Sequence, residues 1–355
     1  MLMKNKVAIV APKLSGRGGT ETVIFKMVTD QHLSKHNKFT VYLVDEIQNK
    51  EWINELENQG VEVVENTSHS KLGRFFFLAK VRGDIVIGLG PKTAYLLKIY
   101  SRIRHSKTRV GSWIHFSLFN SVDLNLKYLK KLDFHLAIAN EIVNQFRQIG
   151  VMSHVYTIYN PVVIEGTQIP RSTNPNVFKM IYMGRLQLDG QKNLRELLLA
   201  LDAFDADFNI ELEVFGGGKE LPTIKKYADT LKLANVHITW HGWTENAWKQ
   251  LDAADALVLT SKFEGFPMVI AEALSFGVPV ISMNTPVGPA DMIVQGENGY
   301  IYKEHNYQDF AEAVQKLKMQ NLSPEKVQDS IDWLTGLNYP NRVENAFEKI
   351  LEIDK

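Results

Sequence analysis

The sequence predicts an α/β protein built from two doubly wound parallel sheets. Short apolar runs alternate with helix-length amphipathic stretches, as expected of parallel strands joined by crossover helices. With 355 residues, 45% of them hydrophobic and 23% charged, the chain is too long for one hydrophobic core. A stretch with several prolines and little periodicity, residues 160–176, divides the apolar runs into two sets. We therefore expect two Rossmann-like domains that face each other across a cleft.

The strand candidates are apolar runs that precede turns or amphipathic stretches. In the first half they are residues 6–11, 39–44, 60–64, 84–88, 108–113, 134–139 and 154–158. In the second half they are residues 179–183, 210–215, 236–240, 256–260 and 279–282. We place the first domain at residues 1–165 and the second at residues 166–337. Ligands of such sheets bind beyond the carboxyl ends of the strands, so the loops after the strands are the candidate sites.

Charge is distributed unevenly along the chain. Residues 1–160 carry 22 Lys and Arg against 13 Asp and Glu, a net charge of +9, and the remainder carries 18 against 27, a net charge of −9. The first half therefore favours a polyanionic neighbour, either a nucleic acid or an anionic membrane surface. No recognised nucleic-acid-binding motif is present, so we expect no nucleic acid partner.

The composition also excludes several classes of protein. The absence of cysteine excludes a disulfide framework and a thiolate nucleophile. The apolar run at residues 7–12 is too short for a signal-peptide core, and no stretch approaches the ~18 uncharged residues of a membrane span. We expect a cytoplasmic protein that is not integral to a membrane.

The first glycine-rich loop follows the first strand and reads Ser15-Gly16-Arg17-Gly18-Gly19-Thr20-Glu21. Its glycines lie at the start of a predicted helix, where backbone amides and the helix dipole favour a phosphate or carboxylate. The spacing is not that of the dinucleotide fingerprint G-x-G-x-x-G. A tight turn between strand and helix would require the same glycines, so both interpretations stay open.

Two cations follow the strand at residues 179–183. Gly184-Arg185 begins a polar loop that ends at Lys192, so both cations can converge on one edge of the cleft and neutralise a diphosphate. A solvated loop is the alternative. The sequence Asp205-Ala206-Asp207 resembles a metal-binding D-x-D, but it precedes a strand, and we interpret it as a turn.

The stretch Ser261 to Leu274 carries two carboxylates around a predicted helix start at about Pro267. Glu264 precedes the helix, whose free amides would point into the cleft. Glu272 lies among apolar residues, where a carboxylate is costly unless it meets donors such as sugar hydroxyls. The alternative for Glu272 is an exposed helix position. Gly288-Pro289-Ala290-Asp291 and Asn298-Gly299 are predicted to be turns.

Two features of the first half remain ambiguous. His115 comes just past a strand end, on the side where ligands bind, although a lone histidine is also common in structural roles. Residues 74–82 combine aromatic residues with flanking cations, as membrane-surface segments do, but a buried helix or strand fits the same pattern.

Taken in order, these motifs resemble those of family 4 retaining glycosyltransferases. The resemblance rests on Gly-Gly-Thr-Glu at Gly18, the segment around His115, Asn160-Pro161, Gly184-Arg185 with Lys192, and the spacing of Glu264 and Glu272. Further motifs of the set are Phe215-Gly216-Gly217-Gly218 and His241-Gly242-Trp243. Within the family, the chain is most similar to the lipopolysaccharide 1,6-galactosyltransferase group.

The resemblance implies a GT-B fold, in which the second domain holds a nucleotide-sugar donor and the first approaches the acceptor. It implies that a last helix, at about residues 338–355, packs back on the first domain. Arg185 and Lys192 would bind the donor diphosphate, Glu272 the ribose hydroxyls, and Glu264 the transferred sugar. The residues Gly265, Phe266, Pro267 and Met268 would hold that sugar through their amides, His115 would lie near the anomeric carbon, and Gly18, Gly19, Gly216 and Trp243 would complete the donor site.

We therefore expect a retaining hexosyltransferase that uses a UDP-sugar, with galactose or glucose favoured, and needs no metal or other cofactor. The acceptor would be a lipid-linked or cell-surface glycan, reached from the inner face of the cell membrane through the basic first domain. A UDP-sugar epimerase on the same scaffold and a non-catalytic nucleotide-sugar or glycan-binding module are the alternatives.

Overall fold

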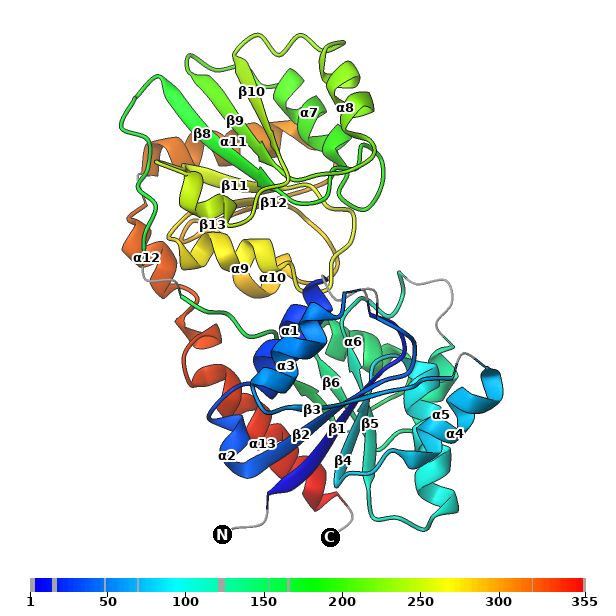
Figure 1. Cartoon of the computed structure of the whole chain (residues 1–355). Coiled ribbons are helices and arrows are strands. Elements are labelled where there is room, and N and C mark those ends of the chain that lie inside the picture. The colour runs from blue at the N-terminus through cyan, green and yellow to red at the C-terminus, as the bar shows by residue number, and fades with distance from the viewer. Residues whose placement is uncertain are drawn as a thin grey trace. The chain divides into compact units, whose positions relative to one another are not determined.

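The computed structural model describes residues 4–14, 18–47, 49–68, 70–120, 125–152, 154–164, 167–320 and 322–353. The chain divides into two compact units (Figure 1). Unit 1 contains Met1–Pro161 and Leu337–Lys355, and unit 2 contains Val162–Gly336. The domain boundary that we predicted, between residues 165 and 166, lies outside the described residues.

The described part of unit 1 forms a parallel seven-stranded sheet with the order β3-β2-β1-β4-β5-β6-β7. Its strands are β1 (Asn5–Ala11), β2 (Asn37–Leu43), β3 (Glu62–Glu65), β4 (Ile85–Gly88), β5 (Arg109–Ile114), β6 (Phe134–Ala137) and β7 (Val155–Thr157). Its α-helices are α1 (Gly19–Val28), α2 (Leu33–His36), α3 (Glu51–Asn58), α4 (Lys71–Lys80), α5 (Pro91–Ile103), α6 (Asn140–Gln148) and α13 (Asn338–Glu352), and Leu126–Lys131 forms a 3₁₀ helix. Helices cover both faces of the sheet, with α4 and α5 together on one of them (Figure 1). The predicted α/β class is confirmed.

The last helix, α13, packs against α2 and β4 of unit 1. Its buried side chains Tyr339, Val343, Phe347 and Ile350 recur every three or four residues and form one apolar stripe. On the partly exposed side, Glu344 Oε2 lies 3.0 Å from His32 Nε2, just before α2. This stripe explains why the end of the chain belongs to the same compact unit as its beginning.

The sheet of unit 2 is parallel and six-stranded, with the order β10-β9-β8-β11-β12-β13. Its strands are β8 (Val177–Met183), β9 (Asn209–Phe215), β10 (Val236–Gly242), β11 (Ala256–Leu259), β12 (Val280–Met283) and β13 (Gly299–Tyr302). Its α-helices are α7 (Leu194–Asp202), α8 (Leu221–Ala228), α9 (Met268–Ser275), α10 (Pro289–Met292), α11 (Tyr307–Gln320) and α12 (Pro324–Asp329), with 3₁₀ helices at Ala247–Gln250 and Asp332–Leu334. Residues 205–207 lie between α7 and β9, so the turn predicted there is confirmed.

Two turn predictions for unit 2 are wrong in part. Asn298 lies in a turn, as predicted, but Gly299 begins β13, a strand that we did not predict. A Cβ at Gly299 would lie 2.2 Å from the carbonyl oxygen of Val280 in β12, so glycine is needed for the two strands to pair. Likewise, Pro289 starts the short helix α10 after Gly288, whose φ of 103° is in the left-handed region.

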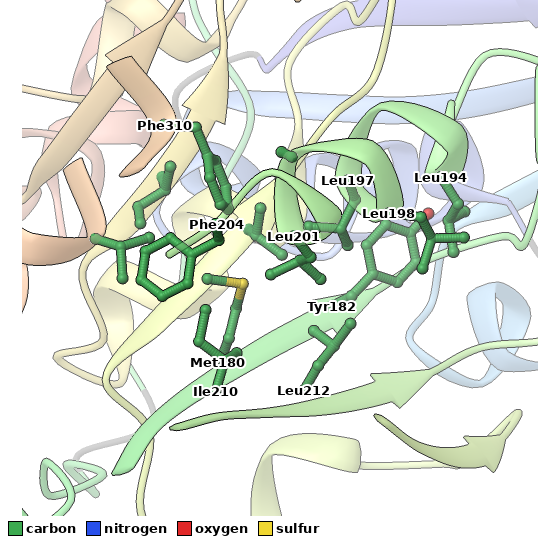
Figure 2. Packing of buried hydrophobic residues seen from close by; sticks show 14 of the residues in the cluster. Met180, Tyr182, Leu194, Leu197, Leu198, Leu201, Phe204, Ile210, Leu212 and Phe310 are labelled. Carbon is green, nitrogen blue, oxygen red and sulfur yellow. The ribbon is translucent and has the colours of Figure 1, made fainter. Parts of the chain in front are cut away.

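The core of unit 2 is formed by apolar side chains of α7, β8, β9 and α11 (Figure 2). On α7, Leu194, Leu197, Leu198 and Leu201 recur at the spacing of one helix face and are all buried. They pack over Met180 and Tyr182 of β8 and over Ile210 and Leu212 of β9 (Figure 2). Each leucine contributes about 2 kcal/mol of burial free energy, which fixes β8 and the loop that follows it.

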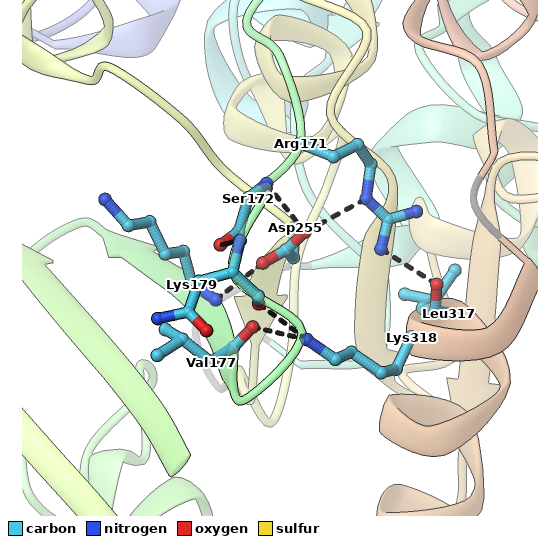
Figure 3. A network of polar contacts seen from close by, with 8 residues as sticks. Arg171, Ser172, Val177, Lys179, Asp255, Leu317 and Lys318 are labelled. Carbon is cyan, nitrogen blue, oxygen red and sulfur yellow. Dashed lines mark hydrogen bonds and ion pairs between the residues drawn. The ribbon is translucent and has the colours of Figure 1, made fainter. Parts of the chain in front are cut away.

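At the other end of these strands, Asp255 ties the beginning of unit 2 to the sheet (Figure 3). Its buried carboxylate lies 3.1 Å from Arg171 Nε and accepts hydrogen bonds from the backbone amides of Ser172 and Lys179. Arg171 also donates to the carbonyl of Leu317 in α11, at 2.8 Å. Asp255 precedes the amino end of β11, so this network holds the scaffold and lies away from the carboxyl ends of the strands.

Candidate functional site

The candidate site in unit 2 lies where the strand order of the sheet changes direction, between β8 and β11. Loops that leave neighbouring strands in opposite directions at such a point open a crevice at the carboxyl edge. Here hydrogen bonds join the two loops: the Lys262 amide donates to the carbonyl of Gln191 at 2.9 Å, and Gln191 Nε2 donates to the carbonyl of Phe263 at 3.0 Å. The loops after β8 and β11 therefore hold each other in place.

Lys192 and Glu264, both predicted site residues, form an ion pair between these loops. Lys192 Nζ donates to Glu264 Oε1 at 2.7 Å, and the two side chains are 20% and 9% exposed. An ammonium has three N–H donors, and within the described residues only Glu264 accepts one of them. The pair thus presents a partly exposed cation and a nearly buried carboxylate at the sheet edge.

Arg185 belongs to the same edge. A Cβ at Gly184 would lie 3.9 Å from Lys192 Cε. The Lys192 side chain therefore lies close to the backbone turn formed by Gly184 and Arg185, which we call the Arg185 turn. The Arg185 carbonyl accepts a hydrogen bond from the Tyr182 hydroxyl at 3.1 Å, and burial raises the pKa of Tyr182, which keeps it a neutral donor. The Arg185 side chain is exposed and has no ion-pair partner in the described part of the chain. Its guanidinium is available to an anionic ligand.

Gly216 follows β9, the strand next to β8. Its φ is 147°, and a Cβ there would lie 1.8 Å from the carbonyl oxygen of Gly184. Only glycine permits this backbone contact, which places the predicted glycine loop against the Arg185 turn. Trp243 follows β10 and is 77% exposed. A Cβ added at Gly217 would lie 3.5 Å from the Cβ of Trp243, so this tryptophan lies beside the glycine loop.

The helix that follows Glu264 is α9. It begins at Met268, with Pro267 as the preceding cap residue, one position later than predicted. Phe266 is buried, which anchors the turn between Gly265 and the helix. Glu264 therefore lies within one short turn of a helix N-terminus, where the dipole favours negative charge.

Of the two interpretations of Glu272, the structure supports the exposed helix position. Glu272 is exposed on α9, because the helical period buries its neighbours Ala271 and Ala273 and turns Glu272 outward. Its carboxylate accepts a hydrogen bond from Trp248 Nε1 at 3.2 Å, and Trp248 stacks on Phe276 with ring centroids 5.3 Å apart. Sequence reasoning missed Trp248, since no spacing connects it to Glu272.

In unit 1, Gly18 caps α1 and Gly19 is its first residue. Residues 15–17 of the predicted loop lie outside the described residues. A Cβ at Gly18 would lie 2.5 Å from Glu21 Oε2, so the buried Glu21 carboxylate folds back over the start of the helix. No role for Glu21 is predicted from the sequence; the available signal is an acid in the first helical turn after two glycines.

His115 lies immediately after β5, as predicted, with its ring centroid 4.5 Å from that of Trp113. Burial lowers the pKa of His115 to about 3, and the charge of Glu21 opposes this shift. The imidazole is therefore neutral near pH 7. The loop that follows is held by Gln145, which accepts a hydrogen bond from the Leu118 amide at 2.7 Å.

The Nε2 atom of His115 is buried and, among the described residues, has no hydrogen-bond partner. Buried polar atoms are rarely left unpaired, so such an atom marks a place where a ligand or water completes the structure. His115 and Glu21 thus form a second candidate site, within unit 1.

The described residues hold neither a metal-binding cluster nor a membrane-spanning helix. They contain no group of three or more His, Asp or Glu side chains arranged to hold a metal ion. No helix among them has both the length and the apolar composition needed to cross a membrane.

Comparison with known proteins identifies the family. Residues 167–331 match the family described as glycosyl transferases group 1. The chain is 30% identical to lipopolysaccharide 1,6-galactosyltransferase of Escherichia coli K12, over 95% of this chain and 96% of that protein. It is 27% identical to the enzyme of the same name from Salmonella typhimurium LT2, over 97% of this chain and all of the relative.

Solved structures agree with this assignment. The apo form of the lipopolysaccharide outer core galactosyltransferase WaaB matches with a TM-score of 0.85 and 26% identity, over 97% of this chain and 99% of that one. Anabaena HepE in complex with UDP matches in fold, with a TM-score of 0.75 and 18% identity over 97% of this chain and all of HepE. The chain therefore belongs to the group 1 glycosyltransferases, known also as glycosyltransferase family 4, and it has the GT-B fold.

Proposed function

We propose that this glycosyltransferase transfers a hexose, galactose or glucose, from a UDP-sugar to a lipid-linked or cell-surface glycan, with retention of anomeric configuration. The observation that carries the proposal is the Lys192–Glu264 ion pair at the strand-order reversal of unit 2, beside the unpaired cation Arg185. The full-length relatives are named as galactosyltransferases, and HepE was solved with UDP.

The two cations of unit 2 suit a diphosphate. When the bond from the sugar to UDP breaks, negative charge grows on the departing phosphate, and positive groups already held in place stabilise that charge. Arg185 supplies a planar fork of donors and Lys192 a compact charge. Because these side chains can absorb the charge themselves, the proposed transfer does not need a metal ion.

The remaining predicted site residues complete the proposal. Glu264 would accept hydrogen bonds from hydroxyls of the transferred sugar, and the backbone N–H groups of Gly265, Phe266 and Met268 would donate to them. Pro267 has no N–H and would contribute by fixing the turn into α9. Glu272, oriented by Trp248, would accept the ribose hydroxyls. Gly216 and Trp243 would border the nucleotide, and Gly18 and Gly19 the phosphates.

His115 would contact the transferred sugar as a neutral donor or acceptor, because its lowered pKa excludes an imidazolium near pH 7. In the proposed step, an acceptor hydroxyl attacks the anomeric carbon from the face that UDP leaves. A new carbon–oxygen bond forms as the bond to the diphosphate breaks, and the departing phosphate takes the hydroxyl proton. The unpaired Nε2 of His115 supports a ligand contact at this position.

The acceptor and location are part of the same proposal. Unit 1 would approach a glycan or glycolipid, and the net charge of +9 on residues 1–160 would favour the anionic inner leaflet of the cell membrane. Salt should then release the protein from anionic vesicles, and binding that does not respond to salt would contradict the electrostatic part.

Release of UDP, measured with and without a lipid-linked glycan acceptor, tests the function. The proposal predicts UDP release that depends on the acceptor. Conversion of the donor sugar without acceptor and without UDP release would indicate a UDP-sugar epimerase. Donor binding with no turnover under either condition would indicate a nucleotide-sugar or glycan-binding module.

A further inference from the structure

The excess positive charge of unit 1 is concentrated in one stretch of sequence. Residues 66–109 contain ten Lys and Arg and a single acid, Asp84, whereas the rest of residues 1–160 contains twelve of each sign. The Asp84 carboxylate is occupied by the backbone amide of Lys6, at 2.7 Å. The whole net charge of +9 therefore belongs to a segment that folds as α4, β4 and α5.

Helix α4 exposes large apolar side chains on this charged surface. Leu72, Phe75 and Phe76 are 66%, 49% and 56% exposed, and their spacing of three and four residues places them on one side of the helix. The opposite side, with Phe77 and Leu78, is buried. The sequence left open whether residues 74–82 form a buried element or a membrane-surface segment. In the structure, one side of α4 is buried and the other side is exposed.

This helix is firmly held against unit 1. The Ser70 side chain caps its start by accepting from the Gly73 amide at 2.9 Å. Phe75 meets Tyr100 of α5 edge to face, with centroids 5.0 Å apart. At the other end, Arg104 donates to the Ala79 carbonyl at 2.6 Å. The exposed apolar side chains are therefore presented on an ordered helix beside α5 (Figure 1).

The same segment carries exposed cations. Arg74 is paired with Asp45 at 2.9 Å, and Lys98 with Asp133. Other cations of the segment are exposed and have no ion-pair partner in the described part of the chain; they are Lys71, Lys80, Lys92, Arg102 and Lys107. Exposed aromatic and aliphatic groups among unpaired cations are the composition of a helix that lies in the headgroup region of an anionic bilayer.

We propose that α4 is the membrane anchor of the protein: Leu72, Phe75 and Phe76 enter the interface of an anionic bilayer while the neighbouring cations bind lipid phosphates. A second copy of the chain fits this surface poorly, because a two-fold contact would bring the exposed cations of one copy, Lys71 and Lys80 among them, against the same cations of the other. The inference deepens the membrane part of the proposed function and rests on it for its biological setting, but its physical test does not require transferase activity.

The test is sedimentation of the full-length protein with vesicles of phosphatidylcholine, alone or mixed with phosphatidylglycerol. We expect binding to the mixed vesicles only, weakened about fivefold by each of Lys71→Ala and Lys80→Ala. Leu72→Ser with Phe76→Ser should weaken binding about tenfold or more, whereas Met152→Ser, at a residue that is 78% exposed elsewhere on unit 1, should not. Phe75 is left intact because it packs on Tyr100, and thermal melting verifies that each variant is folded.

Insertion itself has a separate readout. Tryptophan fluorescence of Phe76→Trp should shift to the blue with mixed vesicles and be quenched by lipids brominated in the acyl chain, while Met152→Trp should show neither effect. Vesicle binding unchanged in the Leu72/Phe76 variant, or no quenching of the introduced tryptophan of Phe76→Trp in the bound protein, would overturn the proposal. So would a dimer in vesicle-free solution that the Leu72/Phe76 variant abolishes.

Stabilisation by UDP-galactose and UDP-glucose, measured by thermal shift on the same proteins, keeps the two proposals separate. If UDP-sugars still stabilise a variant that cannot bind vesicles, membrane binding by α4 is separate from donor binding. Vesicle binding without donor stabilisation would contradict the proposed donor and leave the anchor standing.

Discussion

Lys192→Ala should reduce turnover by at least tenfold, and by about a hundredfold at the magnitude usual for such contacts. The ammonium lies 2.7 Å from Glu264 at the carboxyl edge of the unit 2 sheet. In the proposed reaction it stabilises the charge that grows on the departing diphosphate. Loss of one such contact raises the barrier by about 3 kcal/mol, which is about two decades in rate.

The same change affects stability, so the two effects need to be separated. At an effective dielectric constant of about 20, charges 2.7 Å apart attract by about 6 kcal/mol before their desolvation is subtracted. The Lys192 side chain is 20% exposed, and water can partly replace it beside Glu264. We expect a loss of about 1–3 kcal/mol in the free energy of unfolding, which leaves the protein folded at room temperature.

The assay is the initial rate of UDP release in the presence of acceptor, at a temperature where melting curves show each variant folded. Lys262→Ala is the matched control, since Lys262 is an exposed lysine of the adjoining loop and should retain normal turnover. Lys192→Ala combined with Glu264→Gln should recover stability without recovering rate. Near-normal turnover of folded Lys192→Ala would refute the assigned role.

Three other predictions follow from the same geometry. Trp248→Phe should raise the KM for the UDP-sugar severalfold with little change in kcat, because Glu272 loses the indole donor at 3.2 Å; an equal fall in kcat would argue against a binding role. Burial lowers the pKa of His115 and of His135 to about 3, against 6.5 without burial, so unfolding takes up protons between these values. The contribution of these two histidines to stability should thus be complete above about pH 6.5 and fall with decreasing pH, by up to about 1.4 kcal/mol per unit for each histidine. In urea unfolding, His135→Gln should show about half of the wild-type slope, because only His115 still contributes. A chelator should leave UDP release unchanged, and loss of activity that magnesium restores would show that the cations of unit 2 do not suffice.

Most of the sheet could be predicted from the sequence, because buried parallel strands are continuous apolar runs. The runs at residues 179–183 and 210–215 lie within β8 and β9, which extend only one or two residues further. Strand β13 was missed because Asn298-Gly299 has the composition of a turn. The reason for its glycine is the closeness of Val280, and that becomes visible only once the two strands are paired.

The candidate site was predictable in its residue types but not in its contacts. Lys192 and Glu264 are 72 positions apart, and only the strand order of unit 2 brings their loops together. The outward direction of Glu272 follows from the helical period, whereas its partner Trp248 comes from a 3₁₀ helix with no motif of its own. Long-range pairs of this kind depend on topology, which local patterns do not contain.

The central claim is that fixed cations of unit 2 hold the diphosphate of a UDP-sugar. Calorimetric titration of UDP and of uridine into the wild-type protein and into Arg185→Ala tests it most directly, because uridine lacks the phosphates. We expect Arg185→Ala to bind UDP about tenfold to a hundredfold more weakly than the wild type, which corresponds to the loss of one charge-assisted hydrogen bond. Both proteins should bind uridine equally well. Equal UDP affinity in the two proteins would contradict it.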